Sequence, residues 1–367
     1  MIPYSRGGTR GCLRNIPMKQ CMMVVSALVA SLLVGSVSHA QGPAPTIPSS
    51  VIKAARPLST SEQAIVTKYV EYWVGQLKTG VPATVKLSRN KLTELLLLGA
   101  GQHFTMFYDK TLASRLPKAL DSKNVLVRIN AMLSGKHCKS RQMVLPLSRG
   151  LVDQSPAVVY NAAKVALVMT SDADLDTQQK LVLLKPLAKA LAKESSPWVI
   201  ELLYGSLIEI GQAKAWTPVL AKINQRCNTL SLNPQADANA EFAGLRRLVN
   251  KMAKTGGAST ESLKSVVVVS TRLLILATRV EADGEVTGGD ATAFVQIKDV
   301  ADGALQWAGK GLKLKVPDSI RGKPLLEQQL GADVWKQMLT DANGPFKLKA
   351  SEVDLPKKKP AVDSASR

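Results

Sequence analysis

Few residues in this chain have the type and spacing that catalysis or metal binding requires. His137 and Cys138 form an isolated pair without further ligands at the one-turn spacing of a zinc site. Residues 172–176 (Asp-Ala-Asp-Leu-Asp) begin like a calcium-binding loop, but Thr177 stands where that loop needs glycine and Leu183 where it needs a bidentate glutamate. We therefore expect an acidic turn before a helix here, with no metal site and no cofactor.

A second set of residues follows the order of the SxxK, SxN and KTG motifs of penicillin-binding proteins and β-lactamases. These residues are 88–91, 231–233 and 254–256. In those enzymes the KTG triplet lies on a strand beside the active site. Here residues 254–256, like a second KTG triplet at 78–80, lie where a helical pattern stops at glycine. We therefore expect two helix ends and no acyl-transfer site.

The other short catalytic motifs are missing from the chain. It contains no GxSxG elbow, phosphate-binding glycine loop or HExxH pair. We therefore expect a protein without catalytic residues. An enzyme built on paired carboxylates stays open as an alternative, because such pairs leave no short motif.

The clearest chemical signal is positive charge. The formal net charge is +20, and residues 110–149 hold nine basic residues against one acid, Asp121. Gathered on one face, these side chains would attract an anionic partner, whereas scattered over a solvated helical surface they would form no site. The stretch has no aromatic residue of the kind that nucleic-acid grooves use. The candidate anion-binding or partner-binding residues are Arg128, Lys136, Lys139 and Arg141.

The first forty residues have the composition of a signal peptide. They contain no acid and four basic residues, followed by an apolar run over 22–37 and small residues at Ser38 and Ala40. We expect cleavage between Ala40 and Gln41, and Met18 would be a more ordinary start. The run is shorter than the roughly 20 residues of a spanning helix. After removal of the signal peptide we expect no transmembrane span and a periplasmic or secreted protein.

Cys138 and Cys227 are the cysteines that follow the predicted signal peptide. In an oxidising compartment they could form a disulfide. The alternative is two separate buried side chains, and the sequence does not decide, because pairing depends on the distance between the Cα atoms.

The composition favours packed helices over a β-sandwich, because 46% of residues are apolar but only 4% are aromatic. Ser59 and Glu62 predict a capping box that opens a helix. The segment 259–281 could by β-branching form two strands, but its length and its start at Ser259 favour a helix. Helices are expected at residues 86–98, 103–116, 237–254, 259–281, 290–307 and 325–339, with a loop at 228–236.

Three consecutive stretches resemble one another. Residues 124–131, 155–162 and 196–203 align at offsets of 31 and 41 residues, and each follows a short helical stretch with an early proline. In each unit, Asn or Ser is expected to cap a second helix whose Val127, Val158 or Val199 faces inward. One such helix pair cannot bury its apolar side alone, so neighbouring pairs must stack.

These units resemble HEAT or armadillo repeats, with Val127, Arg128 and Ala131 as the closest match to the family pattern. Val159 and Ile200 replace the arginine in the other copies, and Leu203 replaces the alanine in the third. The resemblance implies an all-α solenoid with flanking helices. The expected organisation is a signal peptide (1–40), a Pro-containing linker (41–57), capping helices (58–104), HEAT-like repeats (105–225), a C-terminal helical region (226–345) and a basic disordered tail (346–367).

This organisation predicts a non-catalytic exported scaffold that binds another protein of the bacterial cell envelope. The alternative is a basic module that holds an anionic envelope polymer, a membrane surface or nucleic acid. An envelope enzyme that uses carboxylates is the third interpretation.

Overall fold

The computed structural model describes residues 43–97, 99–284 and 286–356. Within these ranges all regular secondary structure is helical, so the predicted all-α class is confirmed. The predicted signal peptide, its cleavage between Ala40 and Gln41 and the start at Met18 lie outside the described residues.

The described residues form long helices and several short helical turns. In chain order they are α2 (Ser49–Ile52), α3 (Thr60–Leu77), α4 (Pro82–Leu97), α5 (Gln102–Leu120), α6 (Val125–Ser134), the 3-10 helix η2 (Arg141–Met143), α7 (Val144–Gly150), α8 (Pro156–Ser171), α9 (Thr177–Leu181), α10 (Leu184–Lys193), α11 (Pro197–Glu209), α12 (Ala213–Leu232), α13 (Asn239–Thr255), α14 (Thr260–Asp283), α15 (Gly288–Gly311), α16 (Leu325–Thr340) and α17 (Ala350–Val353).

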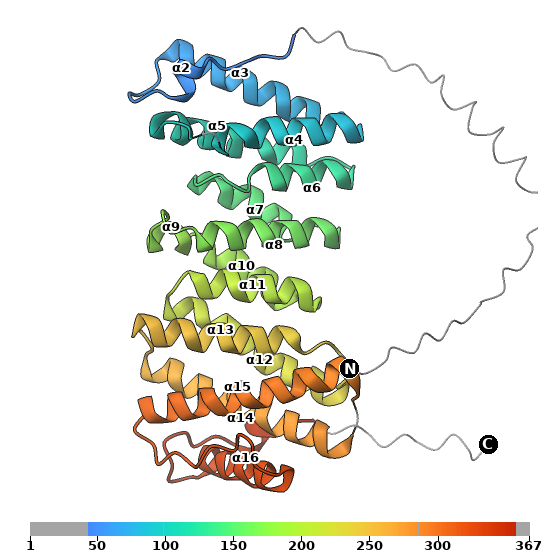
Figure 1. Ribbon diagram of the computed structural model, residues 1–367, viewed down its shortest axis with the longest axis vertical. Helices are drawn as coiled ribbons and strands as arrows, with labels where there is room; N and C mark the ends of the chain where they lie inside the picture. The colour runs from blue at the N-terminus through green and yellow to red at the C-terminus, as the bar shows by residue number, and fades with distance from the viewer. Residues whose placement is uncertain (1–42, 98, 285, 357–367) are drawn as a thin grey trace, which may run out of the picture. The chain divides into compact units, whose positions relative to one another are not determined.

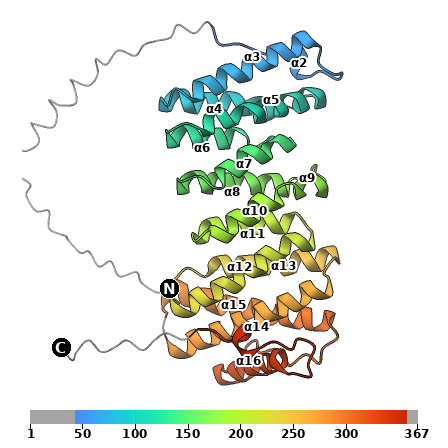
Figure 2. The ribbon, with the colours of Figure 1, turned by 180° about the vertical axis from the view of Figure 1, so that it is seen from behind.

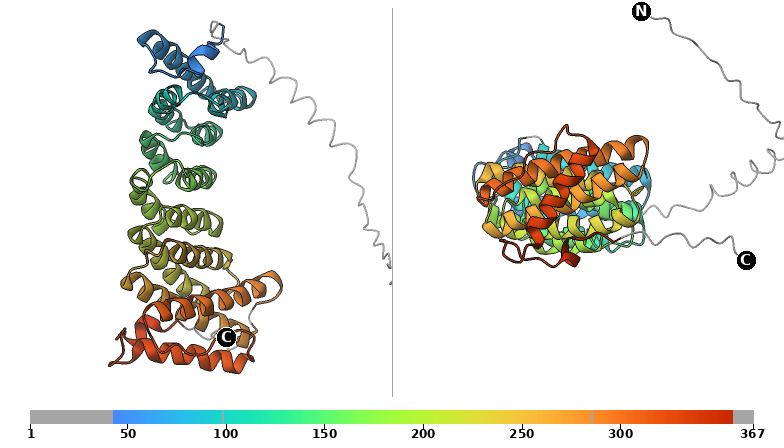
Figure 3. Two further views of the ribbon diagram at one scale, coloured as in Figure 1. Left: turned by 60° about the vertical axis from the view of Figure 1, so that its left-hand side comes forward. Right: turned by 90° about the horizontal axis from the view of Figure 1, so that it is seen from below.

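Helix pairs stack on one another in two layers (Figure 1). In one layer α4, α6, α8, α11, α13 and α15 pack in this order, each on the next. In the other layer the order is α5, α7, α10, α12 and α14. Figure 2 shows the stack from behind, and the left view of Figure 3 looks along the helices and separates them into two columns. The hydrophobic core runs between the layers.

The three similar stretches begin α6, α8 and α11, as predicted. Val127, Val158 and Val199 are buried in the core. The side chain of Asn124 caps α6 by accepting a hydrogen bond from the Leu126 N–H at 2.9 Å. At α8 and α11 the expected serine caps are absent. There, a carboxylate two residues earlier accepts the serine N–H instead.

Helix ends differ from prediction where buried side chains extend a helix. α5 continues past Leu116 through Pro117, although a proline inside a helix costs about 3 kcal/mol. Ala119 and Leu120 are buried there, which offsets that cost. α12 runs to Leu232, over part of the expected loop at 228–236, because Leu230 is fully buried. The segment 259–281 is helical, as predicted.

The predicted domain boundaries do not separate domains. The boundary at 104/105 lies inside α5, and the boundary at 225/226 lies inside α12. The described residues from Pro45 onward belong to one compact unit. The helices over 105–225 therefore share a continuous core with the helices that flank them.

The segment expected as a Pro-containing linker, 41–57, packs where the structure describes it. Val51 and Ala54 are buried, and the Ile52 carbonyl accepts a hydrogen bond from the Gly101 N–H at 2.8 Å. The expectation of an unpacked linker is therefore wrong here. The apolar side chains among the prolines cover the start of α5.

Gly101→Ala is expected to destabilise the protein by about 2 kcal/mol, within the range for overpacked sites. A Cβ at position 101 would lie 2.5 Å from the Ala54 carbonyl oxygen, a backbone atom that cannot turn aside. Gly75→Ala is the matched control. A Cβ meets nothing within 4 Å there, and alanine favours this exposed position in the last turn of α3. Thermal unfolding measures both; equal melting temperatures would contradict the docking of α2 on α5.

The segment 344–356, here named the C-terminal strap, also packs. Val353 and Leu355 are buried, and the Leu348 N–H donates to the Leu339 carbonyl at 3.0 Å. The Arg272 side chain donates to the Asp354 carbonyl at 3.3 Å. The predicted disordered tail at 346–367 is therefore wrong for 346–356, and 357–367 lie outside the described residues.

Candidate functional site

A groove of about 850 Å³ lies along the first half of α5 and is here named the α5 groove. It exists because the next helix of the same layer, α7, has seven residues against nineteen in α5. At 1.5 Å per residue, α7 covers little more than a third of the length of α5. The loop before η2, η2 itself and the start of α9 form the opposite wall.

The lining of the α5 groove combines apolar, amide and charged side chains. Met106 is 63% exposed although it lies on a packed helix. Three amides line the groove beside it, from Gln102, Gln142 and Gln179. Amide groups both donate and accept hydrogen bonds, as the backbone of a bound chain requires.

Two lysines and an arginine supply the positive charge of the groove. Lys139 is balanced by two acids, because its ammonium group forms ion pairs with Asp174 and Asp172. The hydrogen bond to Asp174 raises the pKa of Lys139. Lys110 and Arg141 are exposed and form no ion pair among the described residues. The exposed charge without a counter-ion on the groove wall is therefore positive.

Asp109 lies at the floor of the α5 groove and is 2% exposed. One carboxylate oxygen, Oδ2, accepts a hydrogen bond from the Lys139 N–H at 2.7 Å. The other, Oδ1, is buried without a hydrogen-bond partner among the described residues. Burial raises the pKa of Asp109 to about 6. The carboxylate thus holds the loop at Lys139 against α5, at the cost of its own desolvation.

Asp109→Asn is expected to stabilise the protein above pH 6. The pKa of Asp109 is raised on folding, so its ionisation opposes folding as pH rises from about 4 to about 6. A shift of about two units corresponds to roughly 2 to 3 kcal/mol, which asparagine avoids if its Oδ1 accepts the Lys139 N–H. Denaturant unfolding from pH 3.5 to 7.5 measures the difference. A constant difference across this range would refute the assignment.

The structure brings together three of the four candidate binding residues. Lys136, Lys139 and Arg141 lie on one short segment that lines the α5 groove and the smaller cavities beside it. Arg128 does not join them, since it precedes them near the other end of α6. It forms a two-fold ion pair with Asp153, at 2.8 and 2.9 Å, so its guanidinium is used within the fold.

Other basic residues of the stretch 110–149 are also paired inside the chain. Arg115 pairs with Glu71 at 2.7 Å, and Arg149 pairs with Asp121 at 2.7 Å. The stretch therefore does not form one face of free positive charge.

Cys138 and Cys227 are both buried and both free, so the disulfide considered for them is not formed. Cys138 follows α6 and Cys227 lies on α12. Between these elements lie α7 and α10, which pack on each other and on α12. Burial raises the pKa of both thiols.

The motifs with a superficial likeness to known sites lie at helix ends. Gly80 and Gly256 follow helix ends with φ values of +73° and +63°, as predicted for the two KTG triplets. Asp176 caps α9 in a capping box with Gln179, as predicted for an acidic turn. In the described ranges, no three or more His, Cys, Asp or Glu residues are placed to hold a metal ion.

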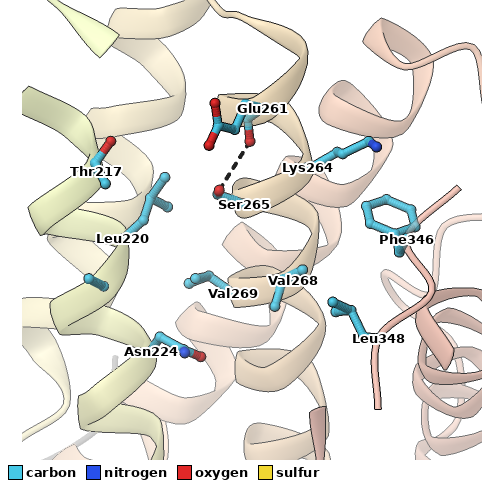
Figure 4. A pocket seen from close by; sticks show the side chains of 11 residues that line it. Thr217, Leu220, Asn224, Glu261, Lys264, Ser265, Val268, Val269, Phe346 and Leu348 are labelled. Carbon is cyan, nitrogen blue, oxygen red and sulfur yellow. Dashed lines mark hydrogen bonds between the residues drawn. The ribbon is translucent and has the colours of Figure 1, made fainter. Parts of the chain in front are cut away.

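A second groove, of about 350 Å³, lies between α12 and α14 and is here named the α12 groove (Figure 4). Leu220 and Val268 face it from the two helices, and Phe346 and Leu348 reach it from the C-terminal strap. The Lys264 ammonium donates to the Pro345 carbonyl at 3.0 Å. The chain's own strap therefore lies along this groove.

The sequence patterns did not single out Met106, Asp109 or Lys110 as site residues. The sequence does contain one signal for Asp109: it lies four residues before Ala113 and thus on the apolar stripe of its helix. An acid on such a stripe marks either a buried ion pair or a site.

Comparison with protein-family models finds none that matches this chain. Comparison with curated proteins finds no match either. Among the residues that the structure describes, no helix combines the length and apolar character needed to cross a membrane.

Proposed function

We propose that this protein is an exported, non-catalytic scaffold of HEAT-like helix pairs that binds another envelope protein through the α5 groove. The observation that carries the proposal is the groove itself, with an exposed Met106 beside three amides and two unpaired cations. Stacked helix pairs present such surfaces to partners in general. Export is inferred from the composition of residues 1–40.

A protein partner fits the groove better than an anionic polymer does. A polymer is held chiefly by an array of free cations, and its binding weakens steeply with salt. Here Arg115, Arg128, Lys139 and Arg149 are each paired with an acid of the same chain. What remains is a short groove with apolar and amide groups, which suits a polypeptide.

Site-specific photo-crosslinking in the native cell tests the proposal. A photoreactive residue replaces Met106 in the full chain, and a matched variant carries it at Leu87, an exposed apolar position on α4. We expect one protein adduct at 106 that is missing at 87. The adduct is identified by mass spectrometry, and its protein is purified and tested for binding to the scaffold at low and high salt.

Two results would count against the scaffold. One is equal labelling at positions 106 and 87, which indicates collisions. The other is a combination of two observations: moderate salt abolishes binding of the purified adduct protein, and the scaffold retains anionic polymer. This combination would favour the basic-module interpretation.

A further inference from the structure

The C-terminal strap shows how this layer of helices holds an extended polypeptide. Side-chain donors of α12 and α14 hold its backbone carbonyls, namely Lys264 at Pro345, Arg272 at Asp354 and Ser231 at Pro356. Between these contacts the strap places Phe346 and Leu348 against apolar helix faces (Figure 4). Cationic and hydroxyl donors bind the strap's backbone, and its apolar side chains line the groove.

The α5 groove offers the same combination in the same layer. Its cationic donors are Lys110 and Arg141, and its exposed apolar contact is Met106. In the part of the chain that the structure describes, no segment lies in this groove as the strap lies along the α12 groove. Because the amides add donors and acceptors, a bound chain can satisfy its backbone polar groups there.

Charge identifies the kind of chain that fits. Lys139 is balanced by Asp172 and Asp174, and Asp109 is buried beneath the Lys139 N–H. The charges left for a ligand are thus Lys110 and Arg141. The chain's own C-terminal residues 357–359 are three lysines, which these cations repel. The two free cations therefore favour an occupant that carries acids.

We propose that the α5 groove binds an extended acidic peptide segment of the partner, with one apolar side chain on Met106 and flanking carboxylates on Lys110 and Arg141. This rests on the proposed scaffold function and specifies the chemistry of the partner. Affinity comes from the apolar contact and the backbone hydrogen bonds, and the two cations select the charge of the ligand.

Fluorescence anisotropy with a labelled probe peptide tests this. The probe, Ser-Glu-Glu-Leu-Glu-Glu-Ser, is titrated with the full chain. The variant K110A/R141A is expected to bind about tenfold more weakly, because it loses two charge pairs with the probe. The control K118A/K123A removes two exposed lysines that do not line the groove and should bind within about twofold of the original chain. Far-ultraviolet circular dichroism checks that both variants stay folded.

Two further probes examine the parts of the proposal separately. A probe with lysine in place of each glutamate should fail to bind. A probe with serine in place of leucine should bind the original chain and the variant Met106→Ser with equal affinity. Equal binding of the acidic and basic probes would overturn the proposal. The affinities of both double variants for the acidic probe and for dextran sulfate, a polyanion, are also compared. Equal losses of affinity in the two variants for both ligands would overturn the proposal, because they indicate general attraction of polyanions.

Competition separates this proposal from the scaffold function. The acidic probe should suppress the adduct at position 106, and the basic probe should not. An adduct that the acidic probe does not suppress would keep the scaffold function and overturn the acidic-peptide assignment. The absence of both the adduct and probe binding would overturn both.

Discussion

Replacing Glu241 with alanine is expected to lower the free energy of unfolding by about 3 to 5 kcal/mol. Glu241 on α13 is fully buried, and its carboxylate lies 3.0 Å from the Arg226 guanidinium on α12. Arg226 is 7% exposed and also donates to the Asp237 carbonyl at 2.6 Å. Alanine would leave this buried cation without its counter-charge, and the cost of an unpaired buried charge exceeds that of a lost surface contact.

Urea unfolding measures the change, with Asp121→Ala as the matched control. Asp121 also pairs with an arginine, Arg149, but both side chains are exposed, so its loss is expected to cost under about 1 kcal/mol. Similar losses in the two variants would mean that Arg226 reaches solvent when its partner is gone. Glu241→Gln should fall between them, because the amide keeps the shape and one acceptor but not the charge.

Ending the chain after Asn343 is expected to cost roughly 5 kcal/mol. The deletion removes Val353 and Leu355 from the core and uncovers the side of α14, and each buried aliphatic side chain contributes about 1.5 to 3 kcal/mol. It also takes the Asp354 carbonyl from the buried Arg272. Hydrogen exchange should rise first along α12 and α14.

The control for this truncation ends the chain after Pro356 and thus keeps the whole strap. We expect its thermal unfolding to match that of the full chain. Equal melting temperatures for the chains ending at 343 and 356 would show that the strap adds nothing to stability. The packing of Val353 would then need another explanation.

The sequence was a good guide to elements whose signal is local. Ser59 with Glu62 forms the predicted capping box, and the apolar length of 259–281 correctly indicated one helix. The inward positions of Val127, Val158 and Val199 also follow from spacing within one turn of a helix. These features depend on residues that are close in sequence, so local patterns were enough.

The packed ends and the groove depend on contacts between residues distant in the sequence. Prolines near 41–57 and lysines near 357–359 suggested unpacked segments, but the buried Val51 and Val353 depend on partners far along the chain. The α5 groove arises from the unequal lengths of α5 and α7. The charge that stays unpaired in the groove depends on which lysine forms the ion pair with Asp174. Neither fact can be read from spacing.

The stacking order of the helices has a consequence for how the protein opens. In the stack, α8 packs on α6 before it and α11 after it, so its contacts are close in sequence. In such quasi-one-dimensional stacks stability is a sum over neighbours, and ends can open while the middle stays folded. The strap fastens the C-terminal end. At the N-terminal end α3 packs on α4 and α5, and α2 packs on α5, but no comparable strap crosses these helices in the described residues. The helices that carry the α5 groove should therefore be the first to fray. A bound partner would then act as a clamp, measurable as slower amide exchange in α3 to α6.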